Sequence, residues 1–463
     1  MLRFPSIGRA GVAALALALA GCASLAPPYE RPAAPVAAQF DGGEPGGKGP
    51  VAADLEWQRF FADPRLKRLI GVALENNRDL RIAALSIEQA RAQYQVRRAD
   101  LLPTVNLGVS AARQPSPLTG EQASSYTAGV QITAFELDFF GRIRSLSQAA
   151  LAQYLATEEA RRTAQIALVA AVATTYMNLL ADDELLEVTR QTLLSRDESL
   201  KLTKLKYDNG AASELDYRQA ESLVYAARVS QAALTRQRAL DHNALVQLLG
   251  QPMPADLPAP LRVLDQELVP DLPAGVPSEV LVRRPDVRQA EQLLIAANAN
   301  IGAARAAFFP RISLTASAGI ASTELSGLFN DGKFAWTFLP QLLLPIFDAG
   351  RNQANLEVAQ VNREIAVAQY EKAIQAAFRE VSDALAGRAT LIDQVRAQRL
   401  QVNAEAARLR LADLRYRNGA ASYLDVLDAQ RSLFAAQQAI VQAQASQVQN
   451  LVALYKVLGG GWQ

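Results

Sequence analysis

Apolar and polar residues alternate in four short segments of the chain. From Arg311 to Ile320, Ile, Leu and Ala alternate with Arg, Ser and Thr. A segment at about 334–347 begins with alternating aromatic residues, and two earlier segments begin near Val105 and Ala128. A period of two places successive side chains on opposite faces of a strand. The pattern therefore predicts four strands of roughly ten residues, two in each half of the chain.

Such two-faced strands fit two different structures. One is a small soluble sheet with one buried face. The other is part of a membrane barrel, with an apolar face toward lipid, a polar face toward a lumen and aromatic residues at the interface. Four strands cannot close a barrel by themselves, whereas three chains would supply twelve.

Most of the remaining chain has apolar residues three to four positions apart, which is typical of helices. Two segments of about 65 residues, 143–208 and 352–417, contain no proline. Each would be about 100 Å long, a length that favours a coiled-coil-like helix packed against neighbours. Further helices are predicted at about 65–99, 213–249, 279–307 and 422–458.

One half of the chain resembles the other. YDNGAASELD at 207–216 and YRNGAASYLD at 416–425 are identical at eight of ten positions and lie 209 residues apart. LLPTVNLGVSA (101–111) likewise corresponds to FFPRISLTASA (308–318). A period this long indicates duplication of a half-protein rather than a solenoid. We therefore expect a first repeat (61–250), a Pro-rich connecting segment (251–278) and a second repeat (279–463).

The repeated decapeptide has the composition of a tight turn between two helices. Asn-Gly ends a helix well, because Gly adopts the left-handed conformation that follows the last turn. Ser213 and Ser422 can then cap the returning helices, with Asp216 and Asp425 at the third helical position in a weaker form of the capping box. Each repeat is thus predicted to contain a helical hairpin with a slim tip.

The second hairpin carries an additional carboxylate close to its tip. Asp425 and Asp428 are three residues apart and share one helical face, whereas the first hairpin has Gln219 in place of Asp428. A solvated acidic face is one interpretation. In a trimer with these tips around an axis, six carboxylates would instead form a ring that repels anions and attracts cations.

The N-terminus has the pattern of a secretory leader. Arg3 and Arg9 precede the apolar run Val12–Ala20, which is too short to span a membrane. Leu19-Ala20-Gly21-Cys22 follows and resembles the bacterial lipobox, with the only cysteine of the chain at its end. We therefore expect a signal peptide at 1–21.

The mature chain would begin at a lipid-modified Cys22. No aspartate comes directly after this cysteine, which by resemblance to lipoprotein sorting favours the outer membrane. Residues 22–60 would form a lipid-anchored tether, and the Pro- and Gly-rich residues 31–50 favour flexibility within it. Beyond the leader we expect no apolar, uncharged stretch of about 18 residues, so a membrane crossing would use strands.

Composition argues against several other classes. The net charge is +1, so no nucleic-acid surface is implied, and one Cys with one His cannot supply a Cys/His zinc site. His242 could serve as a catalytic base, but a histidine on a helix surface explains it better. No GxxxxGKS/T nucleotide motif is present. We therefore expect neither an enzyme nor a bound cofactor or metal.

Several motifs resemble those of the TolC-like outer-membrane efflux family. They are the lipobox, RRPDVRQAE (283–291), YRNGAASYLDVLDAQRSLFAAQQ (416–438) and LVALYKVLGGGW (451–462). The resemblance spans essentially the whole mature chain and is closest to the lipoprotein branch that includes OprM.

The resemblance implies a mainly α protein with a small β part. Three chains would form an outer-membrane efflux duct with a twelve-stranded β-barrel, four strands per chain, and a long coiled-coil-like helical tunnel in the periplasm. The duct would be passive. Its partners would be a periplasmic adaptor and an inner-membrane pump of the resistance-nodulation-division (RND) type, which supplies the energy.

The resemblance also implies roles for residues at the hairpin tips. The positions matching the family's periplasmic gate are Tyr416, Leu424, Asp425, Asp428 and Arg431. The positions matching its adaptor-docking tips are Gly210, Ser213, Leu215, Gly419, Ser422 and Leu424. Other members carry an arginine at the position of Ala421, so closure here would depend more on Leu424, Asp428 and Arg431.

Two alternatives remain at this point. The same fold serves as the exit duct of type I secretion systems. A non-conducting stalk that spans the envelope is the other alternative, although the alternating strands argue against it.

Overall fold

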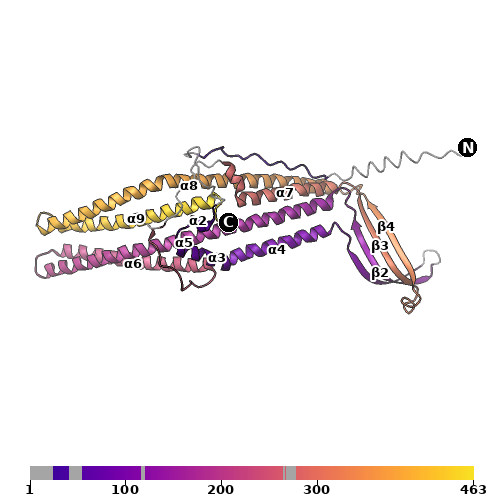
Figure 1. Ribbon diagram of the computed structural model, residues 1–463, viewed down its shortest axis with the longest axis horizontal. Coiled ribbons are helices and arrows are strands. Elements are labelled where there is room, and N and C mark those ends of the chain that lie inside the picture. Colours follow the sequence, from indigo (N-terminus) through magenta and orange to yellow (C-terminus); the bar gives the residue numbers. More distant parts are fainter. Residues whose placement is uncertain (1–23, 41–54, 116–119, 264–265, 267–277, 463) are drawn as a thin grey trace. The chain divides into compact units, whose positions relative to one another are not determined.

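A computed structural model describes residues 24–40, 55–115, 120–263, 266 and 278–462. Its helices are α2 (Trp57–Phe60), α3 (Pro64–Asn76), α4 (Arg78–Ala99), α5 (Arg142–Asp208), α6 (Glu214–Leu249), the 3-10 helix η3 (Ser278–Arg283), α7 (Pro285–Ala306), α8 (Arg351–Arg417) and α9 (Tyr423–Val457). Its strands are β1 (Val105–Pro115), β2 (Gln122–Glu136), β3 (Arg311–Ser322) and β4 (Lys333–Leu343). The four strands and the long helices predicted from hydropathy are confirmed (Figure 1).

The chain divides into two compact units. The first contains residues up to Ala33, Ser86–Glu158 and Gln289–Lys372, and therefore holds the sheet. The second contains Ala34–Leu85, Glu159–Arg288 and Ala373 onward, and holds both hairpin tips.

The first unit contains one antiparallel sheet in the order β1-β2-β3-β4. The central pair, β2 and β3, joins the two halves of the duplication, and a bulge between Ile132 and Phe135 interrupts its register. Gly129 lies opposite Gly319, and a Cβ atom on Gly129 would lie 2.4 Å from the carbonyl oxygen of Ala318. The two backbones can approach this closely because neither residue has a side chain.

The outer strands of this sheet remain open. Among the described residues, β1 and β4 each pair with a strand on one side only. Phe334, Trp336 and Phe338 project from one face of β4, and Trp336 is 69% exposed. Unpaired edges and an exposed aromatic face are unstable in water. These features favour association of the sheet with a further strand or with an apolar surface.

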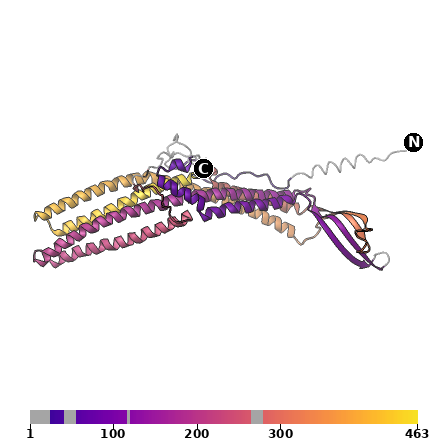
Figure 2. The same ribbon diagram turned by 60° about the horizontal axis from the view of Figure 1, so that its bottom comes forward.

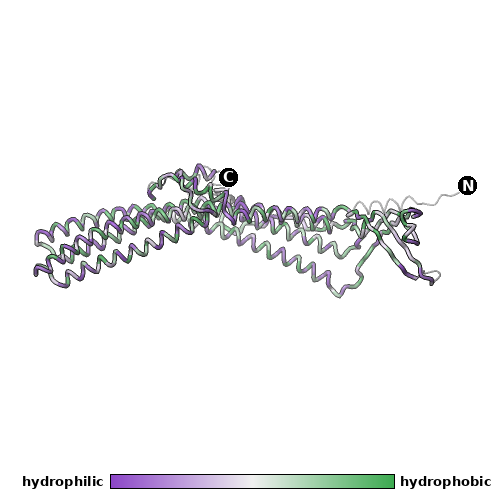
Figure 3. Tube along the Cα trace, turned by 90° about the horizontal axis from the view of Figure 1, so that it is seen from below, coloured by the Kyte–Doolittle hydropathy of each residue, from purple (hydrophilic) through white to green (hydrophobic). Residues whose placement is uncertain are grey.

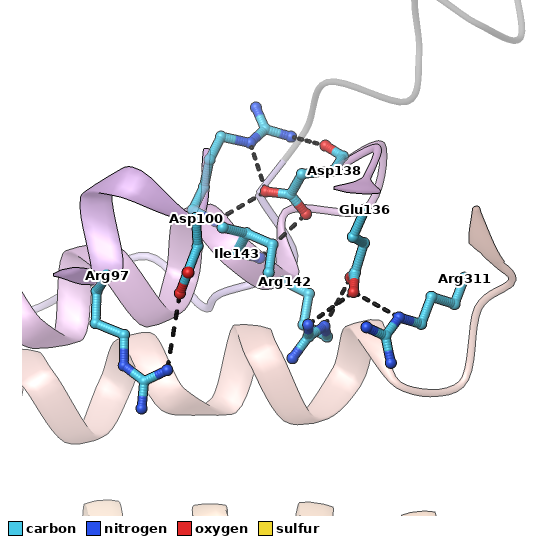
Figure 4. Close-up of polar contacts among 8 residues, drawn as sticks. Arg97, Asp100, Glu136, Asp138, Arg142, Ile143 and Arg311 are labelled. Atoms are coloured by element: carbon cyan, nitrogen blue, oxygen red, sulfur yellow. Dashed lines mark hydrogen bonds and ion pairs between the residues drawn. The ribbon is translucent and has the colours of Figure 1, made fainter. Parts of the chain in front are cut away.

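A charged cluster stabilises the junction between strands and helices (Figure 4). Glu136, at the end of β2, accepts two hydrogen bonds of 2.7 Å from Arg142 and pairs with Arg311 of β3 at 2.6 Å. Asp138 accepts from the backbone N–H groups of Ile143 and Arg144 and so caps the start of α5. Hydrogen bonding to Glu136 raises the pKa of Arg142.

Each long helix returns as a shorter antiparallel one in the second unit (Figure 2). In this unit α5 lies beside α6, and α8 lies beside α9. Hydrophobic and hydrophilic residues alternate along these helices (Figure 3), as the spacing of three to four residues requires.

Two predicted helices begin or break at other places than expected. The expected helix at 65–99 is interrupted at Asn77, whose side chain accepts from the N–H of Leu80 and donates to the carbonyl of Leu248 on α6. The expected helix at 279–307 begins as η3, and the α-helix starts only at Pro285, which is favourable at a first helical position.

The prediction that no apolar, uncharged stretch of about 18 residues follows the leader is wrong. Thr163–Ala181, within α5, carries no charged residue. In the described part of the chain, α5 is the one helix apolar enough to cross a membrane by length and composition, and 61% of its apolar window is buried. Burial within the fold explains this composition without a membrane.

The N-terminal segment is docked where a flexible tether was expected. Arg31 forms two hydrogen bonds with Glu291 of α7, and Tyr29 donates to the same carboxylate. Phe40 stacks on Phe378, with ring centroids 4.7 Å apart. The signal peptide, Cys22 and residues 41–50 lie outside the described residues.

We expect Gly129→Ala to disrupt the pairing of β2 with β3, because its Cβ would overlap backbone atoms of the opposite strand. Overpacking of this kind costs about 1–3 kcal/mol, measurable as a lower thermal transition of the purified protein. Gly108→Ala is the matched control, since its Cβ meets only the movable side chain of Gln131. Equal stability of the two variants would contradict the close contact.

Candidate functional site

The two hairpin tips have the same backbone hydrogen bonds. After α5, the N–H of Ala211 donates to the carbonyl of Lys206 at 2.7 Å, and Gly210 N–H donates to Tyr207 at 2.9 Å. After α8, Ala420 donates to Arg415 at 2.9 Å and Gly419 to Tyr416 at 3.0 Å. This pattern is a Schellman motif, which requires a left-handed residue at the glycine. Gly210 and Gly419 have φ angles of 73° and 69°.

Capping boxes begin both returning helices, as predicted. The backbone N–H of Ser213 donates to Asp216 at 3.2 Å, and that of Ser422 donates to Asp425 at 3.1 Å. In the first hairpin the N–H of Asp216 also donates to the Ser213 hydroxyl at 3.1 Å. The aspartates thus fix the angle at which each chain leaves its turn.

One leucine is exposed beside each cap. Leu215 is 66% exposed and Leu424 is 50% exposed. They occupy equivalent positions of the repeated decapeptide. Each tip therefore presents one exposed leucine beside a glycine and a serine whose conformations are fixed, a surface suited to a protein partner.

The two predicted gate aspartates have different partners in the structure. Asp425 is held by its own cap at Ser422. Asp428 forms an ion pair with Arg408 of α8, and Arg408 also donates to Glu405 and Ser432 at 3.2 Å. Both carboxylates are therefore held by residues of their own chain.

Sequence reasoning missed Arg408, although the turn could have revealed it. Arg408 and Asp428 are each ten residues from Asn418, so an antiparallel hairpin brings them together. In the first hairpin the positions ten residues from Asn209 are Ser199 and Gln219, which carry no charge. The ion pair thus belongs to the second hairpin alone.

Tyr416 connects the two hairpins. Lys206 of α5 donates from Nζ to the Tyr416 hydroxyl at 3.0 Å and lies 4.8 Å from the centre of its ring. Tyr416 also packs on Tyr423, with ring centroids 5.1 Å apart. Beside these contacts lies a groove of about 900 Å³ between α5, α8 and α9.

Among the described residues, no hydrogen bond or ion pair joins Arg431 to Asp425 or Asp428. Arg431 is exposed, and it lies near the buried Arg196 of α5. Burial, and then the charge of Arg431, lower the pKa of Arg196. Among the described residues no group of His, Cys, Asp or Glu is arranged to hold a metal ion.

Long paired helices with two equivalent tips and an open-edged sheet are features of an envelope channel. The family model described as "Outer membrane efflux protein" matches residues 69–251 and 276–460, and the chain belongs to this family. The expected fold class, mainly α with a small sheet in a TolC-like channel, is confirmed.

Relatives of similar length support this assignment. The probable efflux pump outer membrane protein TtgC of Pseudomonas putida is 50% identical over 461 residues, covering 97% of this chain and 95% of TtgC. The outer membrane protein OprJ of Pseudomonas aeruginosa is 47% identical over 459 residues, covering 98% of this chain and 96% of OprJ.

Solved structures give the same result. The open state of the Neisseria gonorrhoeae MtrE outer membrane channel has a TM-score of 0.87 and 42% identity, over 95% of this chain and 99% of that one. A membrane protein from Pseudomonas aeruginosa also has a TM-score of 0.87, with 46% identity, over 95% of this chain and 98% of that one. The chain is an outer-membrane component of an efflux system. Its family is one of channels rather than enzymes.

We expect Lys206→Met to loosen the contact between the hairpins, because Tyr416 loses its charged hydrogen-bond donor. Loss of one such bond increases local opening by about tenfold, which hydrogen exchange of residues 410–425 would measure. Lys204→Met is the control, since Lys204 pairs with Asp208 on its own helix. The assignment fails if both variants exchange alike.

Proposed function

We propose that this chain forms the exit duct of a tripartite efflux system as a homotrimer. Three copies would pair β1 of one chain with β4 of the next and close a barrel of twelve strands. Closure would satisfy the backbone groups of both open edges, which cannot remain unpaired in lipid. The exposed Phe334, Trp336 and Phe338 would then face the membrane.

The duct would work with a periplasmic adaptor and an inner-membrane pump of the RND type. Curated relatives are named as outer membrane proteins of efflux pumps, which supports these partners. Some are named for toluene, antibiotic or solvent efflux. We infer drug-like and apolar organic cargo, selected by the pump and conducted passively by this chain.

Lipid attachment at Cys22 would anchor the trimer in the outer membrane, with the hairpins extending into the periplasm. The lipobox supports this proposal, and Cys22 lies three residues before Leu25, whose carbonyl accepts a hydrogen bond from Arg305 of α7. Residues 24–33 would then connect the anchor to α7, where Arg31 binds Glu291.

The observation that carries the proposal is the equivalence of the two tips. Their Schellman motifs have the same backbone hydrogen bonds, both caps use a serine and an aspartate, and each tip exposes one leucine. A trimer would present six nearly identical tips to an adaptor arranged with approximate sixfold symmetry. The docking residues would be Gly210, Ser213 and Leu215 in one hairpin and Gly419, Ser422 and Leu424 in the other.

The gate would lie at the second hairpin. Leu424 would narrow the opening, and Asp425 and Asp428 would surround it with negative charge. The ion pair of Asp428 with Arg408 and the bond of Tyr416 with Lys206 would hold each chain in one arrangement. Arg431, on the same helix α9, would add positive charge. An adaptor would open the gate by binding the open arrangement more tightly.

We expect a small, cation-selective conductance from purified trimers in a planar bilayer. In Asp425→Ala/Asp428→Ala the conductance should rise several-fold, because cap and ion pair are both lost, and cation selectivity should fall with the charge. The matched control is Asp216→Ala/Gln219→Ala, which changes the equivalent positions of the first hairpin and should leave conductance unchanged.

Two outcomes would contradict different parts of this proposal. Absence of conductance in well-inserted trimers of every variant would exclude a duct. An equal rise of conductance in the test and control variants would support a duct. It would also show that Asp425 and Asp428 do not form its gate.

A further inference from the structure

Asp182 of α5 is a buried carboxyl group without an ordinary donor. It is 6% exposed, and its Oδ2 atom has no hydrogen-bond partner among protein donors. Asp63 shows the usual situation, because it is 1% exposed and accepts from two backbone N–H groups, Tyr176 and Gln266. A buried carboxylate with no donor is strongly destabilising. Asp182 therefore requires a different explanation.

The group in contact with Asp182 is a second carboxyl, that of Asp241 on α6. The other charged groups that act on it are Asp183 of α5 and Arg238 of α6. Arg238 donates to Asp183, so its charge is already engaged. Gln237 donates to Asp241 at 3.2 Å.

Two carboxyl groups form a hydrogen bond only when one of them carries a proton. One oxygen of Asp241 already accepts from Gln237. Asp182 is the more buried of the two, so it is the member that holds the proton and donates it. Burial, and then the hydrogen bond with Asp241, raise the pKa of Asp182 to about 7.

We propose that Asp182 and Asp241 form a proton-dependent latch that holds α5 against α6 in the first hairpin. With the proton present, the carboxyl groups bind each other and the orphan oxygen is satisfied. Without it, two negative charges face each other in a buried site and the helices separate locally.

The direction of the pH dependence follows from the protonation state. A carboxyl group with a raised pKa in the folded state binds its proton more tightly there than in the unfolded chain. The latch therefore stabilises the hairpin fully in acid, below the ordinary pKa of aspartate at about 4. This stabilisation disappears as the pH rises through about 7.

The duplication supplies an internal comparison. Helices α5 and α8 correspond at an offset of 209 residues, as do α6 and α9. At that offset Asp182 corresponds to Leu391, and Asp241 corresponds to Asn450. The second hairpin therefore has no equivalent acid pair. Only the first hairpin should respond to pH in this way.

The latch would matter for assembly because the same hairpin carries the tip at Gly210, Ser213 and Leu215. That consequence rests on the proposed docking function, whereas the latch itself does not. A hairpin that loosens above neutral pH would present its tip less rigidly to an adaptor.

Hydrogen exchange of the full-length purified trimer between pH 5.5 and 8.5, corrected for intrinsic rates, tests the latch. We expect protection of segments 177–187 and 236–246 to fall by at least tenfold across neutral pH, with segment 386–396 of the second hairpin unchanged. Asp182→Asn should remain protected at pH 8, because its amide donates to Asp241 at every pH.

Asp197→Asn is the matched control. Asp197 also joins α5 to α6, through Arg228 at 3.5 Å, but it is partly exposed. This variant should keep the pH dependence of the wild type. Infrared difference spectra of wild-type protein provide a second readout, since a protonated carboxyl band should be present at pH 6 and lost by pH 8.

Flat wild-type protection across this pH range would overturn the proposal. So would a fall in protection in Asp182→Asn with the wild-type midpoint. If Asp182→Asn does not fold, the infrared spectra of the wild type decide instead. The proposal is then overturned if no protonated carboxyl band is lost between pH 6 and pH 8. None of these readouts uses transport or an adaptor, so they are independent of the duct.

Discussion

Strands β1 and β4 each leave one row of backbone N–H and C=O groups without a neighbour in the described part of the chain. In a membrane such groups must be paired, since no water is present to bind them. In the barrel that we propose, this single requirement would make the chain dependent on copies of itself. A threefold assembly would repeat the hairpins around one axis, and both the docking surface and the gate that we propose would follow from that repetition.

The duplicated halves share a backbone but differ in polar chemistry. Both tips use glycine in the left-handed conformation and an aspartate that returns to a serine cap. The second hairpin adds the pair of Asp428 with Arg408, and the first adds the acid pair of Asp182 with Asp241. The same hydrogen bonds therefore give both turns the same shape, whereas the side chains one or more helical turns away differ between the two hairpins.

Local patterns in the sequence were sufficient for the elements and the tips. Alternation located the strands, absence of proline located α5 and α8, and the decapeptide located both capping boxes, because each of these depends on residues close together in the chain. The break at Asn77 was missed because its side chain bonds with Leu248 on another helix. Arg408 was missed for a similar reason, since its partner is twenty residues away across the turn. The docking of Arg31 on Glu291 joins residues 260 positions apart, and composition alone indicated only a flexible segment.

That docked segment has a mechanical consequence. Besides the two bonds from Arg31 to Glu291, the side chains of Asn298 and Arg305 donate to the backbone carbonyls of Pro27 and Leu25. Gly302 permits close contact with Ala26, because a Cβ there would lie 2.8 Å from the backbone nitrogen of Ala26. A pull applied to the chain ahead of Leu25 would load these contacts in sequence and pass into α7. Residues 32–40, which follow Arg31, would carry no tension until the whole row of contacts had failed.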